Sequence, residues 1–228
     1  MAAPSSSRAL AAPSIYTPAV QDAEALHFEK GALRPLPSPP PDHFAVFGLP
    51  QRLRISTEAV RDLYLDLSRR THPDYFATAD EAAREESLHR ASTLNNAWKA
   101  LRDPVRRAEY FLSLLAPHIE SNKQAVPPSL LEEMFGIQEA GEDLREARLS
   151  GDGSRLDAAE KKAAGLRGEV TEAREALYRT LFEQFGRVDE LLDAGEDSGS
   201  GAVQEALKEM RLTLDRMNYL RTVLRNLR

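Results

Sequence analysis

The chain has 228 residues, with 30 Lys and Arg against 36 Asp and Glu and a formal net charge of −6. It contains no cysteine, which excludes disulfides, a thiolate metal site and a cysteine nucleophile. No apolar run approaches the roughly 18 residues of a membrane span, and the acidic balance argues against nucleic-acid binding. The composition therefore predicts a soluble protein that binds neither a membrane nor a nucleic acid.

The first 42 residues differ in composition from the rest. They hold eight of the 14 prolines and end in a proline-rich run from Pro35 to Pro41. Such a segment buries too little apolar area to offset the entropy of ordering, so we predict a disordered tail over residues 1–42. A targeting presequence is disfavoured because the tail contains Asp22 and Glu24 and only one arginine in its first 25 residues.

Beyond residue 42 the apolar residues recur with helical spacing, and no alternating β-branched run appears. The predicted fold class is therefore all-α. Helices are expected at 57–71, 80–101, 104–115, 129–149, 154–193 and 202–227. Proline and glycine residues mark the breaks between them.

The first two predicted helices are joined by a short polar loop, residues 72–79, so we expect an antiparallel pair with this loop at its tip. Along one side of the second helix we expect Leu88, Ala91, Asn95 and Trp98. Residues 117–127 are expected to be a linker, and the last three helices an antiparallel three-helix bundle over 128–228. The apolar repeat behind this bundle runs through Leu156, Ala159, Ala163, Leu166, Val170, Ala173, Leu177 and Leu181, and then through Val203, Leu207, Met210, Leu214, Met217 and Leu224.

The tripeptide His72-Pro73-Asp74, hereafter the HPD loop, lies between the antiparallel helices. A tripeptide alone is weak evidence, but here it follows an amphipathic helix that ends in basic residues. It also precedes the run Asn-x-Ala-Trp-x-x-Leu-x-Asp-Pro-x-x-Arg-x-x-Tyr over residues 95–110. Several independent motifs in this order make a specific signal.

These motifs resemble the J-domain co-chaperones, in particular their HscB-type iron-sulfur branch. The start Phe44–Pro50, the HPD loop followed by Phe76 and the run at 95–110 match at family spacing, and the resemblance covers residues 43–227. It implies a J-domain at 43–116 that binds an ATP-loaded DnaK-type (HscA-like) chaperone and triggers its ATP hydrolysis. The implied chaperone-binding residues are His72, Pro73, Asp74, Arg69, Arg70 and Arg61.

Physically, Pro73 stiffens the loop, and Asp74 offers a carboxylate to an arginine of the partner. The alternative is that these are merely loop residues that end a helix. Two differences from the family bear on the strength of the contact: Leu65 and Asp66 stand where many J-domains carry basic residues, and Tyr75 stands where the branch often has Lys.

The resemblance also implies that the bundle binds the IscU-like scaffold protein on which iron-sulfur clusters are built. Matching the family's contact positions selects Leu131, Phe135, Glu139, Asp143 and Tyr219. On the helical wheel, the first two and Tyr219 lie away from the predicted core positions, with carboxylates along the flank. The alternative is that the apolar residues belong to the core and the carboxylates are simply solvated.

No residue pattern predicts catalysis. The five histidines are scattered and no glycine-rich loop is present, so we expect no metal site, no cofactor and no enzymatic activity. The predicted function is a co-chaperone in iron-sulfur cluster assembly. The alternatives are a structural adaptor with a degenerate J-like domain, or a J-domain protein with another client. Since mitochondrial relatives often carry a cysteine-rich module, the bacterial cytoplasm is favoured over the mitochondrial matrix.

Overall fold

A computed structural model of the chain describes residues 15–16, 28–29, 32–33, 40–121 and 128–226. For 28–29, 32–33, 128–134 and 223–226 it describes the backbone alone. The described elements are β1 (Phe28–Glu29), β2 (Ala32–Leu33), α1 (His43–Val46), α2 (Thr57–Arg70), η2 (Pro73–Phe76), α3 (Glu81–Leu101), α4 (Pro104–Leu115), α5 (Pro128–Ser150), α6 (Gly153–Asp193) and α7 (Gly201–Asn226).

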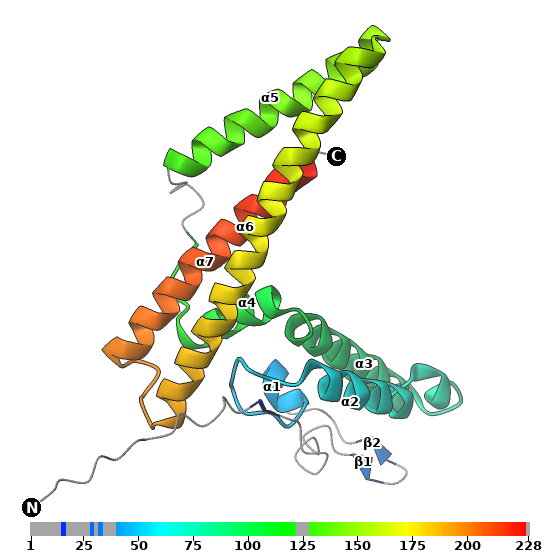
Figure 1. The fold of residues 1–228 in the computed structure, drawn as a ribbon. Coiled ribbons are helices and arrows are strands. Elements are labelled where there is room, and N and C mark those ends of the chain that lie inside the picture. Colours follow the sequence, from blue (N-terminus) through cyan, green and yellow to red (C-terminus); the bar gives the residue numbers. More distant parts are fainter. Residues whose placement is uncertain (1–14, 17–27, 30–31, 34–39, 122–127, 227–228) are drawn as a thin grey trace, which may run out of the picture. The chain divides into compact units, whose positions relative to one another are not determined.

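The all-α prediction is confirmed, with one short two-stranded antiparallel hairpin, β1–β2, as the exception among the described residues (Figure 1). Each of the six helices predicted from the sequence begins and ends within one residue of its expected position. Local capping explains this agreement: Ser56, Asp80 and Asp152 each accept hydrogen bonds from backbone N–H groups in the first turn of the helix that follows.

The chain divides into two compact units, Met1–Tyr110 and Phe111–Arg228. The boundary lies inside α4, before the predicted end of the J-domain at residue 116. Both halves of α4 carry buried apolar side chains, with Val105 in the first unit and Phe111 in the second. Helical spacing identifies such residues as buried, but it does not say which core each of them enters.

The first unit is built on the antiparallel pair α2 and α3, which lie side by side with the HPD loop at the end of the pair (Figure 1). The buried side chains of α2 are Val60, Leu63 and Leu67, and the buried apolar side chains of α3 are Leu94, Ala97 and Leu101. Phe44, Val46, Phe47 and Leu53, from α1 and the segment after it, are completely buried as well.

The inward face of α3 differs from the predicted one. Leu88 is 60% exposed, whereas Ser87 and Arg90 are buried. The predicted side, Leu88, Ala91, Asn95 and Trp98, is displaced by one residue from the buried side, which is Ser87, Arg90, Leu94, Ala97 and Leu101. The structure instead buries two polar side chains at this end of α3, and Arg90 forms an ion pair with Glu86 in which Nε lies 2.7 Å from Oε1. A buried charged side chain is tolerated when it has a partner inside the protein. The spacing of apolar residues gives no information about such a partner, so it could not predict that Arg90 is buried.

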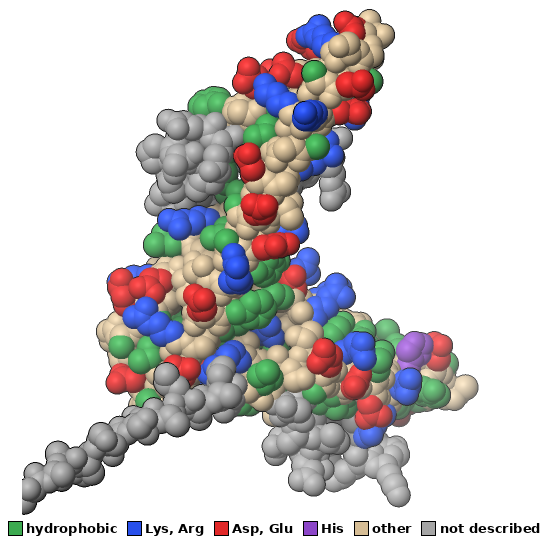
Figure 2. Space-filling view, viewed as in Figure 1, with side chains coloured by type: hydrophobic (Ala, Val, Ile, Leu, Met, Phe, Trp, Pro, Cys, Tyr) green, Lys and Arg blue, Asp and Glu red, His purple; other side chains and the backbone are tan. Residues whose placement is uncertain are grey.

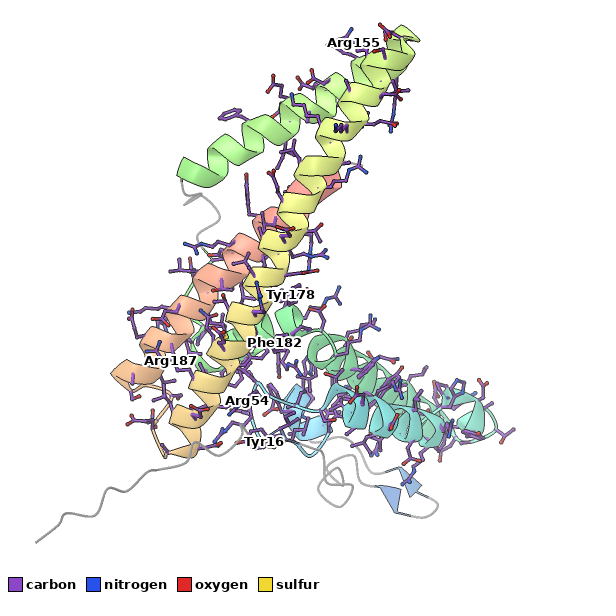
Figure 3. The ribbon with its side chains drawn as sticks, in the orientation of Figure 1. Tyr16, Arg54, Arg155, Tyr178, Phe182 and Arg187 are labelled. Atoms are coloured by element: carbon purple, nitrogen blue, oxygen red, sulfur yellow. The ribbon has the colours of Figure 1, made fainter. Side chains whose placement is uncertain are left out.

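Part of the predicted tail is ordered on the first unit. Tyr16 pairs in parallel with Ile55: its N–H donates to the carbonyl of Arg54 at 2.8 Å, and its carbonyl accepts from the N–H of Ser56 at 2.8 Å. Figure 3 shows Tyr16 beside Arg54. Tyr16 and the β1–β2 hairpin are therefore paired parts of residues 1–42, since extended backbone pairing needs no apolar composition, and a disordered tail over the rest of this segment stays a prediction. Residues 1–14, 17–27, 30–31 and 34–39 lie outside the described part.

In the second unit, α6 packs along both α5 and α7, and the short connections 151–152 and 194–200 make α6 antiparallel to each (Figure 1). Ile137, Val170 and Leu220 form a core cluster to which all three helices contribute. A second cluster, Leu144, Ala147, Ala159 and Ala163, joins α5 to α6 alone, and the small alanines allow the two backbones to approach closely.

The predicted apolar repeats are largely confirmed. Val203, Leu207, Met210, Leu214 and Met217 of α7 are all buried. In α6, Ala173 is exposed, unlike the other members of its repeat. The side chain of Leu224 lies outside the described residues.

Candidate functional site

The HPD loop is the N-terminal turn of the 3-10 helix η2. His72 has extended backbone angles, φ −61° and ψ 128°, as expected for a residue that precedes proline. Its ring caps the turn, since Nδ1 accepts from the N–H of Asp74 at 3.3 Å. The N–H of Tyr75 closes the turn by donating to the carbonyl of His72 at 3.0 Å. The loop is therefore held by its own side chain as well as by proline.

The loop residues are presented to solvent. The side chain of Asp74 is 88% exposed and that of His72 is 51% exposed, and their Oδ2 and Nδ1 atoms lie 3.4 Å apart. Tyr75 is also exposed, and its ring and the His72 ring form a T-shaped contact with centroids 6.4 Å apart. Such a group of exposed, locally ordered side chains suits contact with another macromolecule better than enclosure of a small substrate.

The three arginines selected from the sequence differ in their surroundings. Arg70 forms an ion pair with Asp66 at 2.6 Å, and Arg61 forms one with Asp62 at 3.1 Å. Arg69 is exposed and forms no ion pair within the described part of the chain. A partner must compete with a carboxylate for two of the three arginines, at a cost of about 1 kcal/mol or less for an exposed pair.

The sequence interpretation noted Asp66 only as a missing basic residue and did not pair it with Arg70. The spacing of Asp66 and Arg70 does predict this ion pair, because residues four apart on a helix lie next to each other.

Two residues of the 95–110 run, Asn95 and Trp98 of α3, contact Tyr64 of α2 and so hold the two helices together. The ring of Tyr64 on α2 stacks on Trp98 of α3, with centroids 5.2 Å apart and an angle of 14° between the planes. The hydroxyl of Tyr64 donates to Oδ1 of Asn95 at 2.8 Å. These contacts set the position of α2 against α3, so the motif residues support the loop rather than extend its surface.

Tyr110, the last residue of the run, connects α4 to the first residue of α1, His43. Its hydroxyl accepts a hydrogen bond from the N–H of His43 at 2.9 Å, and the two rings stack with centroids 4.2 Å apart. Burial lowers the pKa of His43, against the opposing effect of Asp42, and burial raises the pKa of Tyr110. Both groups are therefore held in their neutral forms.

The structure describes the side chains of four of the five residues predicted to bind a scaffold, and these four differ in their surroundings. Phe135 of α5 is 66% exposed. Glu139 and Asp143 lie beside Lys162 of α6, whose Nζ is 4.0 Å from Oε2 of Glu139 and 2.9 Å from Oδ2 of Asp143. The hydrogen bond from Asp143 raises the pKa of Lys162. The side chain of Leu131 lies outside the described residues.

The remaining scaffold candidate, Tyr219 of α7, is half-buried and packs against the cluster of Ile137, Val170 and Leu220. It therefore contributes to the core of the bundle. Of the predicted set, Phe135 alone is a largely exposed apolar side chain among the described residues, while Leu212, on the same helix as Tyr219, is 58% exposed.

The acidic flank of α5 is partly neutralised by α6, which the sequence interpretation missed. Besides Lys162, Arg155 near the start of α6, which is labelled in Figure 3, binds Glu146, with Nη2 and Oε2 2.8 Å apart. Figure 2 shows acidic and basic side chains intermingled where α5 and α6 meet. Lys162 and Arg155 appear in the sequence as ordinary surface residues, and only the packing of α6 on α5 pairs them with these carboxylates.

Among the described residues, no cluster of three or more His, Asp or Glu side chains is arranged to hold a metal ion. The helices in the described ranges are all too short or too polar to cross a bilayer.

No model of a known protein family matches the chain. The co-chaperone protein HscB homolog of Ralstonia nicotianae is 36% identical over 140 residues, which make up 61% of this chain and 74% of the relative. The crystal structure of human co-chaperone protein HscB superposes with a TM-score of 0.60 at 21% identity, over 86% of this chain and 84% of the human one. The chaperone HscB from Vibrio cholerae gives a TM-score of 0.50 at 25% identity, over 82% of this chain and 100% of its own.

The human structure supports the fold alone, whereas the Ralstonia relative supports membership of a family. The match to that relative extends over most of its length. The chain also carries the J-domain motifs on an exposed, capped loop and on the helix pair that supports it. The chain therefore belongs to the HscB family of co-chaperones.

Proposed function

We propose that this co-chaperone stimulates ATP hydrolysis by a DnaK-type (HscA-like) chaperone, and that the HPD loop makes the decisive contact. The observation that carries the proposal is the exposed carboxylate of Asp74 on a loop that is already ordered without a partner. A carboxylate and an arginine form a charge-assisted hydrogen bond, which is stronger than one between neutral groups.

The order of the loop reduces the entropic cost of binding. Pro73 restricts one backbone angle, and the ring of His72 caps the turn. A group held in its bound geometry loses little freedom on association, so more of the contact energy appears as affinity. The exposed Arg69 adds a positive charge on α2, which favours approach to an acidic surface of the chaperone.

We further propose that the second unit carries an IscU-like iron-sulfur scaffold protein to the chaperone. Phe135 supports this proposal as a largely exposed aromatic side chain on α5, since large exposed aromatics are frequent anchors of protein interfaces. Binding both partners on one chain raises the effective concentration of scaffold near the chaperone. Leu131, Glu139, Asp143 and Tyr219 complete the proposed scaffold-binding set, and the side chains of Glu139 and Asp143 are 70% and 45% exposed beside Lys162.

The test is single-turnover ATP hydrolysis by the chaperone, measured with and without this protein and then with scaffold added. We expect stimulation by the wild type and its loss in His72→Gln, with helicity unchanged by circular dichroism. His89→Gln is the matched control, because His89 is an exposed histidine of α3 outside the loop. Full stimulation by His72→Gln would contradict the proposal.

A second candidate function is a structural adaptor with a degenerate J-like domain. The observation that favours it is the weakened basic character of α2: Asp66 pairs with Arg70, and Leu65 is exposed where a cation would strengthen the contact. A flat curve in a titration of chaperone turnover with this protein would support the adaptor. Stimulation that does not respond to scaffold would indicate a J-domain protein with another client.

The compartment stays a prediction, with the bacterial cytoplasm favoured over the mitochondrial matrix. Localisation of the tagged full-length chain in its source cells would decide between them.

A further inference from the structure

A buried hydrogen bond lies next to the HPD loop, at the residue that precedes His72. The hydroxyl of Ser87 on α3 donates to the carbonyl of Thr71 at 3.0 Å. Ser87 is fully buried and Thr71 is 1% exposed. Thr71 ends α2 and immediately precedes His72, so this hydrogen bond joins α3 to the residue from which the loop begins.

Thr71 is anchored from two directions. Its own N–H and its hydroxyl both donate to the carbonyl of Leu67, at 2.9 Å each, which ties it to the last turn of α2. Its carbonyl is one of those that a helix leaves without an internal partner at its C-terminus. Ser87 supplies that partner from the facing helix. The contact therefore satisfies a buried carbonyl and connects two helices at one point.

The position of this contact matters because a hydrogen bond is directional and the hydrophobic effect is not. A buried hydrogen bond requires a particular distance and angle between Ser87 and the Thr71 carbonyl, so it specifies one placement of the end of α2 against α3. The inward face of α3 at the loop end consists of Ser87 and Arg90 rather than large apolar residues. Register at this end of the pair therefore depends on polar contacts.

We propose that Ser87 is a positioning residue that holds the HPD loop in the geometry the chaperone binds. Ser87 is buried and touches no partner, so its effect passes through Thr71. The proposal deepens the proposed function, on which its consequence for chaperone stimulation rests. Without the hydroxyl, the end of α2 and the loop sample additional positions, and the fraction of molecules with a binding-competent loop falls.

The size of the effect follows from the value of one hydrogen bond. A net contribution of about 1 kcal/mol corresponds to about a fivefold change in the closed-to-open equilibrium of the loop. Apparent affinity falls in proportion to the competent fraction. The concentration of co-chaperone that gives half-maximal stimulation should therefore rise by up to about fivefold, with the plateau of stimulation unchanged.

The experiment compares the full-length wild type with Ser87→Ala, which removes the hydroxyl and adds no bulk. Thr213→Val is the matched control, because Thr213 is also a buried hydroxyl but donates to a carbonyl of its own helix, that of Glu209 at 3.3 Å. Amide hydrogen exchange is measured at Thr71 and Tyr75, together with the titration of chaperone ATP hydrolysis. Both are run well below the melting temperature of each variant.

We expect exchange at the Thr71 and Tyr75 amides to be about fivefold faster in Ser87→Ala and unchanged in Thr213→Val. Unchanged exchange in Ser87→Ala would overturn the proposal, and so would an equal acceleration in the control, which would indicate general loosening. A fall in the stimulation plateau with no change in the half-maximal concentration would overturn it as well. If the wild type itself stimulates nothing, the proposed function fails, while the exchange measurement still decides what Ser87 does.

Discussion

Replacing Phe135 by alanine should abolish most scaffold binding while leaving the bundle folded. Because the side chain is 66% exposed, only about a third of the roughly 200 Å² that a phenylalanine can bury is removed from water. At about 25 cal/mol per Å², this area of about 70 Å² contributes at most about 1.7 kcal/mol to stability. Phe185, which is fully buried, would cost about 3–5 kcal/mol when replaced by alanine.

The binding effect should be larger than the stability effect. An aromatic anchor at the centre of an interface contributes about 2 kcal/mol or more, which corresponds to a loss of about thirtyfold in affinity. The assay is isothermal titration of the scaffold protein into wild type and Phe135→Ala, accompanied by urea unfolding of each protein. Leu149→Ala is the control, because Leu149 is an 88% exposed apolar residue on the same helix and is no scaffold candidate.

The reasoning is refuted if Phe135→Ala binds scaffold with wild-type affinity, or if Leu149→Ala weakens binding to the same degree. The first result would leave Phe135 as a solvated surface residue. The second would mean that exposed apolar area on α5, rather than an anchor at one position, determines binding. A loss of more than about 3 kcal/mol in unfolding free energy would contradict the area calculation.

Two further predictions concern the stability of the first unit. Burial lowers the pKa of His43 below 6.5, so the unfolded chain binds more protons than the folded chain as pH falls through this range. The neutral His43 therefore contributes its full stabilisation above pH 6.5 and loses it as pH falls toward the folded-state pKa. Thermal melts of His43→Gln should lack this fall in melting temperature. Replacing Glu86 by Gln removes a charge partner of the buried Arg90 and should cost about 3 kcal/mol in urea unfolding. A cost below about 1 kcal/mol would show that other contacts neutralise Arg90.

The helices were predictable because their signals are local. Apolar spacing, Asp or Ser at the N-cap positions, and proline or glycine at the breaks act within a few residues. The HPD loop belongs to the same class, since His72 caps the turn two residues ahead and Pro73 restricts the backbone beside it. In features of this kind, the residues that contact each other are also close together in the sequence, so the sequence pattern predicts them.

The candidate site residues also divide into those whose surroundings are local in sequence and those whose surroundings come from distant parts of the chain. The family resemblance selected Glu139, Asp143 and Tyr219 by their positions in the sequence, but their surroundings come from other helices. Lys162 is 19 residues from Asp143 in the chain, and Tyr219 packs against a cluster whose members come from α5, α6 and α7. A carboxylate that faces solvent and one that faces a lysine look identical in a helical pattern, because the pattern specifies the face and not the neighbour.

The sequence by itself determined an all-α chain, the limits of its helices, the exposed HPD loop and the family resemblance, because each is encoded in short-range spacing or in contiguous motifs. Only the tertiary structure decided that α4 is divided between two units and that Ser87 rather than Leu88 faces α2. The reason is that burial of a polar group depends on a partner, and the partner of Ser87 is a backbone carbonyl 16 residues earlier. The spacing of apolar residues therefore cannot predict that Ser87 is buried against the carbonyl of Thr71.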